Sequence, residues 1–226
     1  MPQLLLEIFS EEIPARMQER AREGLEKAMV EWLGAAGLQA ETVRSFAGPR
    51  RLVFVADGLP EKSADVKEER KGPKVGAPEK AIEGFMRGAG LTSIDQAEVR
   101  DDRKGQFYVA VIDKPGRKTT DGVADAVVEI IKDFHWPKSM RWGDGELRWV
   151  RPIQSILCVF DGKVVPFEIG GVASGDTTEG HRVMGRGPFT VKDFDGYAKA
   201  LREEGYVILD AEERKASIMK QAKAVC

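Results

Sequence analysis

The chain has 226 residues, 42% of them hydrophobic and 32% charged, so it can bury a sizeable core and is expected to fold as one large or two small domains. Lysine and arginine total 35, aspartate and glutamate total 37, and the formal net charge is -2. This balance excludes a protein that coats nucleic acid through an overall positive charge, so any RNA contact has to come from local basic patches.

Signals for export, membrane insertion and disulfide formation are missing from the sequence. Residues 1–7 lack the basic stretch and the long apolar run of a signal peptide, and no segment has the ~18 continuous apolar residues of a spanning helix. Cys158 and Cys226 lie far apart, which fits a reducing compartment better than a disulfide scaffold. We therefore expect a cytoplasmic protein with no membrane partner. Residues 220–226 read as an unfinished helix, so we expect the natural chain to continue.

In chain order, the first predicted elements are a strand, a helix and a hairpin. The apolar run Leu4–Phe9 predicts a strand. Apolar residues at helical spacing between Pro14 and Gly37 predict a long helix, because proline suits a first helical turn and glycine suits a stop. Two β-rich runs, Thr42–Phe46 and Arg51–Val55, flank a Gly-Pro turn and predict a hairpin.

The next predicted elements are a linker, a short helix and a strand. Ser63–Pro78 is charged and contains glycine and proline, which indicates a loop or linker. Helical spacing follows at 78–90, and Gln106–Ile112 reads as a strand. The order strand, helix, strand, strand, helix, strand is that of the ferredoxin-like fold, so we predict an N-terminal α+β domain of this type at residues 1–115.

The remaining patterns predict a second α+β domain at residues 116–226, truncated at its C-terminal end, with mixed or antiparallel sheets and packed helices. Its predicted elements are a helix at 123–134, a strand at Ile153–Phe160, a hairpin that turns at Asp161-Gly162 and continues through Lys163–Ile169, a helix at 194–205, a strand at Tyr206–Leu209 and a last helix from Asp210. The Asp-Gly pair between two apolar runs is the strongest of these signals, because both residues tolerate positive φ angles.

The sequence contains no recognisable catalytic or metal-binding motif. It has no phosphate loop of the G-x-x-x-x-G-K-[ST] type, and its glycine pairs do not match a dinucleotide fingerprint. His135 and His181 have no Cys or His partner at metal-ligand spacing, so each is interpreted as structural. No serine or cysteine lies in a nucleophile elbow. We predict no catalytic residue, no metal site and no cofactor bound by this chain.

One basic segment is also rich in aromatic residues. The stretch Trp136–Asp144 combines two tryptophans with Lys138 and Arg141. Basic residues interleaved with aromatic ones can hold phosphates and stack on bases. The alternative is a loop that its tryptophans anchor to the core while its cations stay solvated.

Two further basic groups are weaker candidates for binding. Arg50 and Arg51 follow a Gly-Pro turn, where paired guanidinium groups can hold phosphate or carboxylate but are also common surface residues. Lys71 lies in a charged run between Lys67 and Lys74 that acidic residues dilute, and such a run is interpreted as a solvated face.

Several motifs, in the same order along the chain, resemble one known family. They are Leu4–Ala15, Gly48–Leu52, Lys71-Gly72-Pro73, Ala81–Phe85, Pro137–Gly143 followed by Arg151-Pro152-Ile153, Gly180-His181-Arg182, and Asp210 with Glu212, Glu213 and Arg214. Together they are similar to the glycyl-tRNA synthetase β subunit of the bacterial two-α, two-β type, with Gly48 where that family usually has threonine. The resemblance spans nearly the whole chain.

The resemblance implies a subunit of a ligase that joins glycine to tRNA(Gly) with ATP. In this family the α subunit carries the class II catalytic core, which uses ATP and Mg²⁺. The β subunit is much longer than this chain and continues into further domains, one of which binds the anticodon. The chain is then the N-terminal part of a β subunit, not catalytic alone. Its expected partners are the α subunit, tRNA(Gly) and the remainder of the β subunit.

Charged or aromatic residues in the basic segments and matching motifs are the candidates for binding RNA or the α subunit. They are Arg50, Arg51, Lys71, Lys138, Arg141, Trp142, Arg151, His181 and Arg182. Two other interpretations stay open. One is a structural scaffold within the synthetase that touches no RNA. The other is an independent hydrolase or editing domain, for which the sequence shows no nucleophile, metal or acid-base set.

Overall fold

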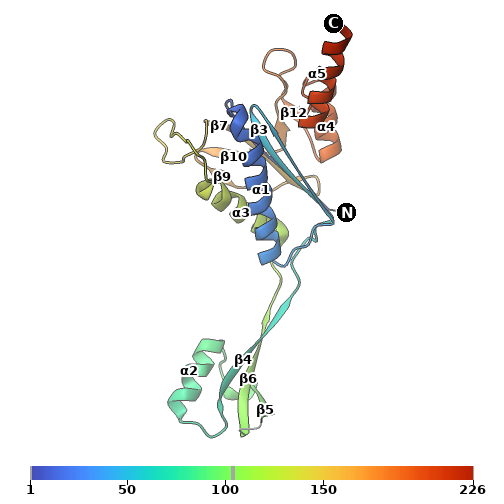
Figure 1. Cartoon of the computed structure of the whole chain (residues 1–226). Helices are drawn as coiled ribbons and strands as arrows, with labels where there is room; N and C mark the ends of the chain where they lie inside the picture. The colour runs from blue at the N-terminus through green and yellow to red at the C-terminus, as the bar shows by residue number, and fades with distance from the viewer. Residues whose placement is uncertain (1, 103–104, 226) are drawn as a thin grey trace. The chain divides into compact units, whose positions relative to one another are not determined.

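The chain forms two units, one of which is inserted into the other. The computed structural model describes residues 2–102 and 105–225 (Figure 1). The main unit comprises Met1–Ser63 and Lys118–Cys226, and the inserted unit comprises Ala64–Arg117. This division differs from the predicted domains 1–115 and 116–226. The first three strands belong with the second half of the chain because β1 (Gln3–Ser10) pairs with β7 (Ile153–Phe160).

The elements confirm the α+β class. Those of the main unit, besides β1 and β7, are α1 (Ala15–Ala35), β2 (Thr42–Gly48), β3 (Arg51–Asp57), α3 (Thr119–Asp133), β8 (Lys163–Val164), β9 (Glu168–Ile169), β10 (Val172–Gly175), β11 (Thr177–Thr178), β12 (Phe189–Thr190), α4 (Phe194–Glu203) and α5 (Ala211–Val225). Those of the inserted unit are β4 (Val66–Lys74), α2 (Glu79–Ala89), a short 3-10 helix η1 (Ile94–Gln96), β5 (Glu98–Asp102) and β6 (Gly105–Lys114).

The main sheet is mixed and has the order β2-β3-β1-β7-β10-β9, with β8 paired to β7. The strand β1 lies between β3 and β7 and is antiparallel to both. β10 runs parallel to β7. Because every neighbour of β1 is antiparallel to it, the end of β1 meets the starts of β3 and β7, and the connections at that edge come together.

The predicted ferredoxin-like arrangement of residues 1–115 is not confirmed. The predicted helix at 78–90 and strand at 106–112 form part of the inserted unit, whose sheet has the separate order β4-β6-β5. The order βαββαβ occurs instead in the main unit. It consists of β1, α1, β2 and β3 before the insert, and of α3 and β7 after it. Periodicity along the chain gives the type of each element but carries no information on which strands pair across 100 residues.

Both faces of β1 are buried, which explains its almost continuous apolar sequence. Leu4, Leu6 and Ile8 belong to the core that α1 and α3 cover. Leu5 points to the opposite face, in a second core closed by α4. Figure 1 shows α1 and α3 next to each other over one face of the sheet. Burying such a side chain contributes roughly 1.5–3 kcal/mol.

The helix α1 lies where its apolar spacing predicts it. Its buried residues Ala21, Leu25, Met29 and Leu33 recur every four positions and therefore share one face. Pro14 precedes the first turn, and Gly37, at a φ of +68°, follows the end in the left-handed region that glycine favours.

The inserted unit corrects the prediction of a linker at Ser63–Pro78. This segment contains β4, which pairs antiparallel with β6. Phe85 and Ala89 of α2 pack on Ala110 of β6 and form a small core of their own. The sequence of β4 does not alternate between apolar and charged residues as a half-buried strand does. The reason is that its three-stranded sheet has few buried positions, so most of its side chains can be charged.

Two predictions in the second half of the chain have opposite outcomes. The hairpin turn at Asp161-Gly162 is confirmed, with φ angles of 49° and 72° at the two central residues. Its second strand is the short β8, and the chain leaves the pairing before Ile169. The predicted strand Tyr206–Leu209 is wrong, because the segment is irregular and Tyr206 itself has a φ of 52°.

Candidate nucleic-acid interface

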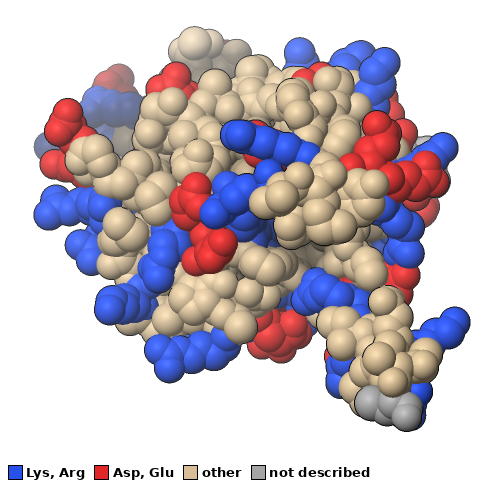
Figure 2. Space-filling model, turned by 90° about the horizontal axis from the view of Figure 1, so that it is seen from above, with Lys and Arg blue, Asp and Glu red and all other residues tan. Residues whose placement is uncertain are grey.

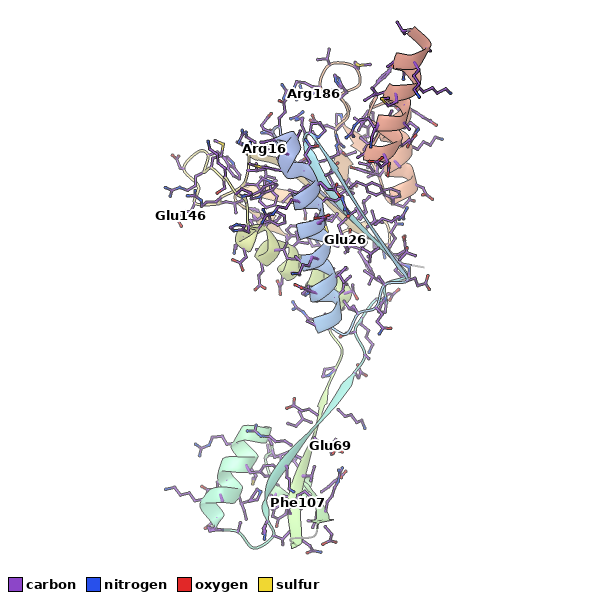
Figure 3. The ribbon with its side chains drawn as sticks, viewed as in Figure 1. Arg16, Glu26, Glu69, Phe107, Glu146 and Arg186 are labelled. Carbon is purple, nitrogen blue, oxygen red and sulfur yellow. The ribbon has the colours of Figure 1, made fainter. Side chains whose placement is uncertain are left out.

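The connections at one edge of the main sheet form the candidate site, which we call the loop end. It comprises residues 10–16, 48–51, 135–152 and 178–188. Backbone hydrogen bonds join its parts: the Ser10 N–H donates to the Arg50 carbonyl at 2.7 Å, and the Glu11 N–H donates to the Pro152 carbonyl at 2.9 Å. In Figure 3, Arg16 at the start of α1 and Arg186 in the loop before β12 lie toward this same end, and Glu146 projects from the 135–152 loop.

The neighbouring residues Arg50 and Arg51 have different environments. Arg51 is buried, with its guanidinium 2.8 Å from the Glu7 carboxylate, and donates to the Glu179 carbonyl at 2.6 Å. The Tyr197 hydroxyl donates to the same Glu7 carboxylate. These contacts clamp the start of the 178–188 loop to β1, β3 and α4. Arg51 therefore holds the fold together, although the turn in which it lies makes it resemble a binding residue in the sequence.

Electrostatics in this buried cluster agree with a structural role. Burial raises the pKa of Tyr197 well above its ordinary value, and the nearby Glu7 carboxylate raises it further. Burial works to lower the pKa of Arg51, but the charge of Glu7 and the contact with Tyr197 raise it overall. Arg51 stays charged and Tyr197 stays neutral and able to donate. A buried cation paired in this way is not available to a ligand.

Arg50, in contrast, faces the surface, where its side chain is 17% exposed. Its guanidinium stacks over the Phe9 ring, 4.5 Å from the centroid. It also donates to the Ser10 carbonyl at 3.3 Å and lies 3.5 Å from the Glu11 carboxylate. These contacts fix its direction, and the planar group remains at the surface, where it can contact an anion.

His181 and Arg182 lie in an exposed loop next to Arg50. The Nδ1 atom of His181 accepts the backbone N–H groups of Val183 and Met184, both at 3.2 Å. Because Nδ1 is the acceptor in both contacts, Nε2 is the ring nitrogen that is left to donate. The Arg182 guanidinium lies 3.1 Å from the Glu11 carboxylate, the same group that faces Arg50.

Close backbone packing supports this loop. The Gly180 N–H donates to the Arg186 carbonyl at 2.8 Å, and the His181 N–H donates to the Gly205 carbonyl at 2.7 Å. A Cβ atom on Gly180 would lie 2.0 Å from the carbonyl oxygen of Gly185 and 2.4 Å from the Cα of Gly205. The crossing therefore requires glycine at position 180, and it sets the 178–188 loop against the segment after α4.

Two neighbouring pockets share Arg50 and Arg182. One has a volume of about 300 Å³, and its remaining lining residues are Glu12, Gly48, Pro49, Arg51, Gly180, His181, Val183, Val207, Ile208, Leu209 and Arg214. The other, of about 350 Å³, is lined by Phe9, Glu11, Gln154, Ser155, Glu179 and Arg186 in addition to the shared pair. Guanidinium groups thus lie along both cavities.

Buried tryptophans hold the 135–152 loop. Trp136 and Trp149 pack edge to face with centroids 5.0 Å apart, and Phe134 lies 5.0 Å from each. Met140 and Trp149 exchange backbone hydrogen bonds of 2.8 and 3.1 Å. Within the described parts of the chain, the indole N–H groups of Trp136 and Trp149 have no hydrogen-bond partner. Packing alone therefore fixes these two rings.

The cations of this loop face outward from that aromatic anchor. Lys138 and Arg141 are exposed, and no ion pair of either side chain occurs within residues 2–102 and 105–225. Trp142 is half-buried and packs against the core. Arg151 is half-buried and donates to the Val150 carbonyl at 2.7 Å. The loop thus has the anchored form that the sequence analysis left open as the alternative, and Lys138 and Arg141 are its accessible charges.

Lys71 is separate from the other candidates because it lies in the inserted unit. Its ammonium group lies 3.9 Å from the centroid of the Phe107 ring on the neighbouring strand β6. The contact is a cation–π interaction within the sheet. Lys71 is therefore described with its own unit and not with the loop end.

A profile of the family described as glycyl-tRNA synthetase beta subunit matches residues 4–226. The chain belongs to the glycyl-tRNA synthetase beta subunit family. The chain is 58% identical over its whole length to the glycine–tRNA ligase beta subunit of Phenylobacterium zucineum and 54% identical, over 98% of its length, to that of Ruegeria sp.. Over 98% of its length it is 50% identical to that of Paracoccus denitrificans. The chain spans about a third of the length of these relatives.

Most of the motifs that carry the resemblance to the glycyl-tRNA synthetase beta subunit meet at the loop end. Pro49–Arg51, Pro137–Gly143 and Gly180–Arg182 lie on different connections, yet the β1-centred sheet brings them to one edge. The sequence alone shows these motifs as distant segments. Their convergence is a result of strand pairing.

The structure adds arginines that sequence reasoning missed. Arg16 and Arg20 line a pocket of about 260 Å³ with His135 and Pro137. Arg148, Arg186 and Arg214 also lie on the loop end or line its pockets. The sequence contains one indication of the pair Arg16 and Arg20: they are four residues apart at the start of a predicted helix, so they lie on the same helix face. Figure 2 shows basic side chains over this end of the main unit, with acidic ones between them.

The described residues offer no site for a metal ion. Within 2–102 and 105–225, no group of three or more His, Cys, Asp or Glu side chains has an arrangement that could hold one. No helix in these ranges is long and apolar enough to cross a membrane. Cys158 is buried as a free thiol, and burial raises its pKa, so it is a small apolar core residue.

Proposed function

We propose that this chain is the N-terminal part of the β subunit of a cytoplasmic glycine–tRNA ligase. It supports the ATP-dependent attachment of glycine to tRNA(Gly) by binding tRNA and by associating with the α subunit. ATP and Mg²⁺ belong to the α subunit in this proposal. The identity of the enzyme is inferred from the family membership, and the tRNA-binding role is inferred from the loop end.

The observation that carries the tRNA-binding role is the pair Lys138 and Arg141. Both are exposed on a loop whose backbone is fixed by Trp136 and Trp149. Because the loop is already ordered, little conformational entropy is lost when the two cations bind a phosphate. RNA is contacted mainly through its phosphates, and accessible, positioned cations are the groups that bind them.

A double variant with Lys138→Ala and Arg141→Ala tests this role. Its affinity for tRNA(Gly) should fall, and the slope of log K against log salt should decrease by about 0.7–0.9 for each lost phosphate contact. The double variant Lys199→Ala with Lys220→Ala removes two exposed lysines of α4 and α5 and is the matched control. Filter binding across a salt series measures both. Full aminoacylation, normal subunit assembly and unchanged tRNA affinity in the Lys138, Arg141 variant would refute the proposal.

A second candidate role is a scaffold that contacts the α subunit and no RNA. Exposed apolar side chains at the loop end favour it: Met140 is 40% exposed, Val183 84% and Met184 60%. Apolar groups outside a core mark protein contacts more often than RNA contacts. In this case Val183→Ser with Met184→Ser should weaken assembly with the α subunit in sedimentation experiments, and the salt slope of tRNA binding should not change.

The assignment of ATP chemistry to the α subunit has its own test. The sequence lacks a phosphate loop, and the family resemblance gives the class II core to the α subunit. Pyrophosphate exchange with glycine, ATP and this chain alone should therefore stay at background. Exchange well above background without the α subunit would contradict the assignment.

A further inference from the structure

The pocket of about 300 Å³ beside Arg50 combines apolar walls with positive charge. Pro49, Val207, Ile208 and Leu209 supply apolar surface. Arg50, Arg182 and Arg214 line the same cavity, and their guanidinium groups add positive charge to it. The volume is at the lower end of the range for small-molecule sites, roughly 300–1,000 Å³. This combination fits a compact ligand that has both an apolar part and an anionic group.

Arg214 contributes a further cation to the pocket. Its Nη1 atom donates to the Ile208 carbonyl at 3.2 Å, which holds the side chain against the pocket wall. Within the described ranges no acidic group lies at ion-pair distance from it. Arg50 and Arg182 share Glu11, and the Arg182 guanidinium also lies 3.5 Å from the Glu12 carboxylate. With Arg214, an incoming anion therefore meets three guanidinium groups beside two carboxylates.

His181 adds a hydrogen-bond donor. Because its Nδ1 accepts two backbone N–H groups, its Nε2–H is the ring's free hydrogen-bonding group. The rigid crossing at Gly180 and Gly205 holds this wall of the pocket against the Val207–Leu209 wall. The cavity is therefore defined by backbone packing and not by a chance arrangement of surface side chains.

We propose that this pocket takes a single unstacked nucleotide of an RNA, with the base between Pro49 and the Val207–Leu209 segment and the phosphate on Arg50, Arg182 and Arg214. Proteins that recognise single-stranded RNA splay bases out of the stack and hold them against apolar groups or guanidinium planes. The second pocket shares Arg50 and Arg182 and adds Arg186, which lies 3.4 Å from the Glu179 carboxylate. In this proposal the neighbouring phosphates of the RNA lie along that pocket. The inference rests on the proposed tRNA-binding function and names the place where one nucleotide is held.

Nuclear magnetic resonance of this 226-residue chain tests the ligand class with defined probes. AMP and UMP should shift the amide signals of His181, Val207, Ile208 and Leu209 in a saturable way. Ribose 5-phosphate and inorganic phosphate, at the same concentrations, should shift them several-fold less, because they lack the base. Equal shifts from all four probes would show a simple anion site and overturn the proposal. Shifts from an acetylated peptide carboxylate larger than those from AMP would also overturn it, in favour of a peptide site.

A variant pair connects the pocket to RNA. Arg214→Ala should weaken AMP binding and reduce tRNA(Gly) affinity at least threefold, and Lys220→Ala, which removes an exposed charge further along the same helix, should change neither by more than a small factor. Ile208→Asp, which adds a carboxylate to the pocket, should abolish the AMP shifts. Thermal melting of each variant checks that the fold is kept.

The outcomes separate this inference from the proposed function. If wild-type chain binds tRNA and both Arg214→Ala and Ile208→Asp bind it equally well, the nucleotide pocket is refuted and the tRNA-binding role stands. If the wild-type chain binds neither tRNA nor AMP, both are refuted. If Arg214→Ala lowers tRNA affinity no more than Lys220→Ala does, the effect is general electrostatics and the pocket assignment is wrong.

Discussion

Glu7 is a carboxylate enclosed within the sheet, and its charge is tolerated because Arg51 lies 2.8 Å away. Breaking a buried pair by neutralising one partner leaves the other charge uncompensated and typically costs about 3–5 kcal/mol. Glu7→Gln should therefore lower the free energy of unfolding by about this amount. Glu11→Gln is the matched control, because Glu11 pairs with arginines at the surface, where such contacts are worth ~0–1 kcal/mol. Urea denaturation measures both, and equal losses would contradict the buried-pair interpretation.

Asp57 is a second residue whose charge supports the fold. Its carboxylate accepts hydrogen bonds from Gln3 at 2.5 Å, Thr42 at 2.8 Å and Arg44 at 2.9 Å. Burial pushes its pKa up, but these three donors outweigh burial and lower the pKa below its usual value. A lowered pKa means that the stabilisation is present above the unfolded pKa of about 3.9 and disappears as the pH falls through the folded value.

Asp57→Asn should therefore show a stability difference that depends on pH. At pH 7 the variant should be less stable by roughly 1–2 kcal/mol, because an amide accepts the charged and neutral donors less well. The difference from wild type should shrink as the pH falls below about 4, because the unfolded carboxylate takes up its proton there while the folded one, with its lowered pKa, is still charged. Urea midpoints at several pH values give the difference directly. A gap that stays constant down to pH 3 would be incompatible with the carboxylate as its source.

Among the elements, α3 offers a direct comparison of its buried and outer faces. Ile131 is fully buried in the core under the sheet, whereas Ile130 is half-buried beside a groove shared with α1. Ile131→Ala should destabilise the main unit by about 2–4 kcal/mol, and Ile130→Ala by less than about 1.5 kcal/mol, because a cavity forms only at the enclosed position. Thermal or urea unfolding compares them. A larger loss at Ile130 would mean that α3 packs through its other face.

Elements with strong local patterns were predictable from the sequence. The strand β1, the helix α1 and the turn at Asp161-Gly162 each combine a clear period with a stop signal, and each was placed correctly. β4 was missed because a strand in a small, largely solvated sheet keeps charged residues at positions where a larger sheet would bury apolar ones. Tyr206–Leu209 was wrongly predicted as a strand, since Val207 and Leu209 pack against the core closed by α4 without pairing to another strand.

The candidate site was predictable only in part. The anchored 135–152 loop follows from tryptophans beside cations, and that pattern is local. The burial of Arg51 was not predicted, because its partners Glu7 and Tyr197 are 44 and 146 residues away. One signal was present: Glu7 interrupts a run of apolar residues that a doubly buried strand requires, so a cation partner was needed. The sequence does not show which arginine fills that role.

For the whole molecule, the inserted unit should be separable from the main one. The chain leaves and re-enters the main unit at adjacent points, since Lys62 and Lys118 form an antiparallel bridge and the Thr119 N–H donates to the Glu61 carbonyl at 2.8 Å. A short glycine linker can therefore replace Ala64–Arg117. The shortened chain should still unfold cooperatively, with a melting temperature within a few degrees of the main transition of the full chain. Circular dichroism checks this, and loss of cooperative melting would show that the main unit depends on the insert.

The pairing of β1 with β7 also sets the order of events on the ribosome. Leu4 pairs with Phe160, so more than 150 residues are made between the two partners of this contact. At a synthesis rate of about 5–20 residues per second, the edge of β1 that pairs with β7 stays unpaired for roughly 8–30 s. The insert and the β2–β3 hairpin draw on neighbouring sequence and can form during this wait. An unpaired strand edge is a site of association with other chains, so nascent β subunits are most at risk of aggregation in this interval.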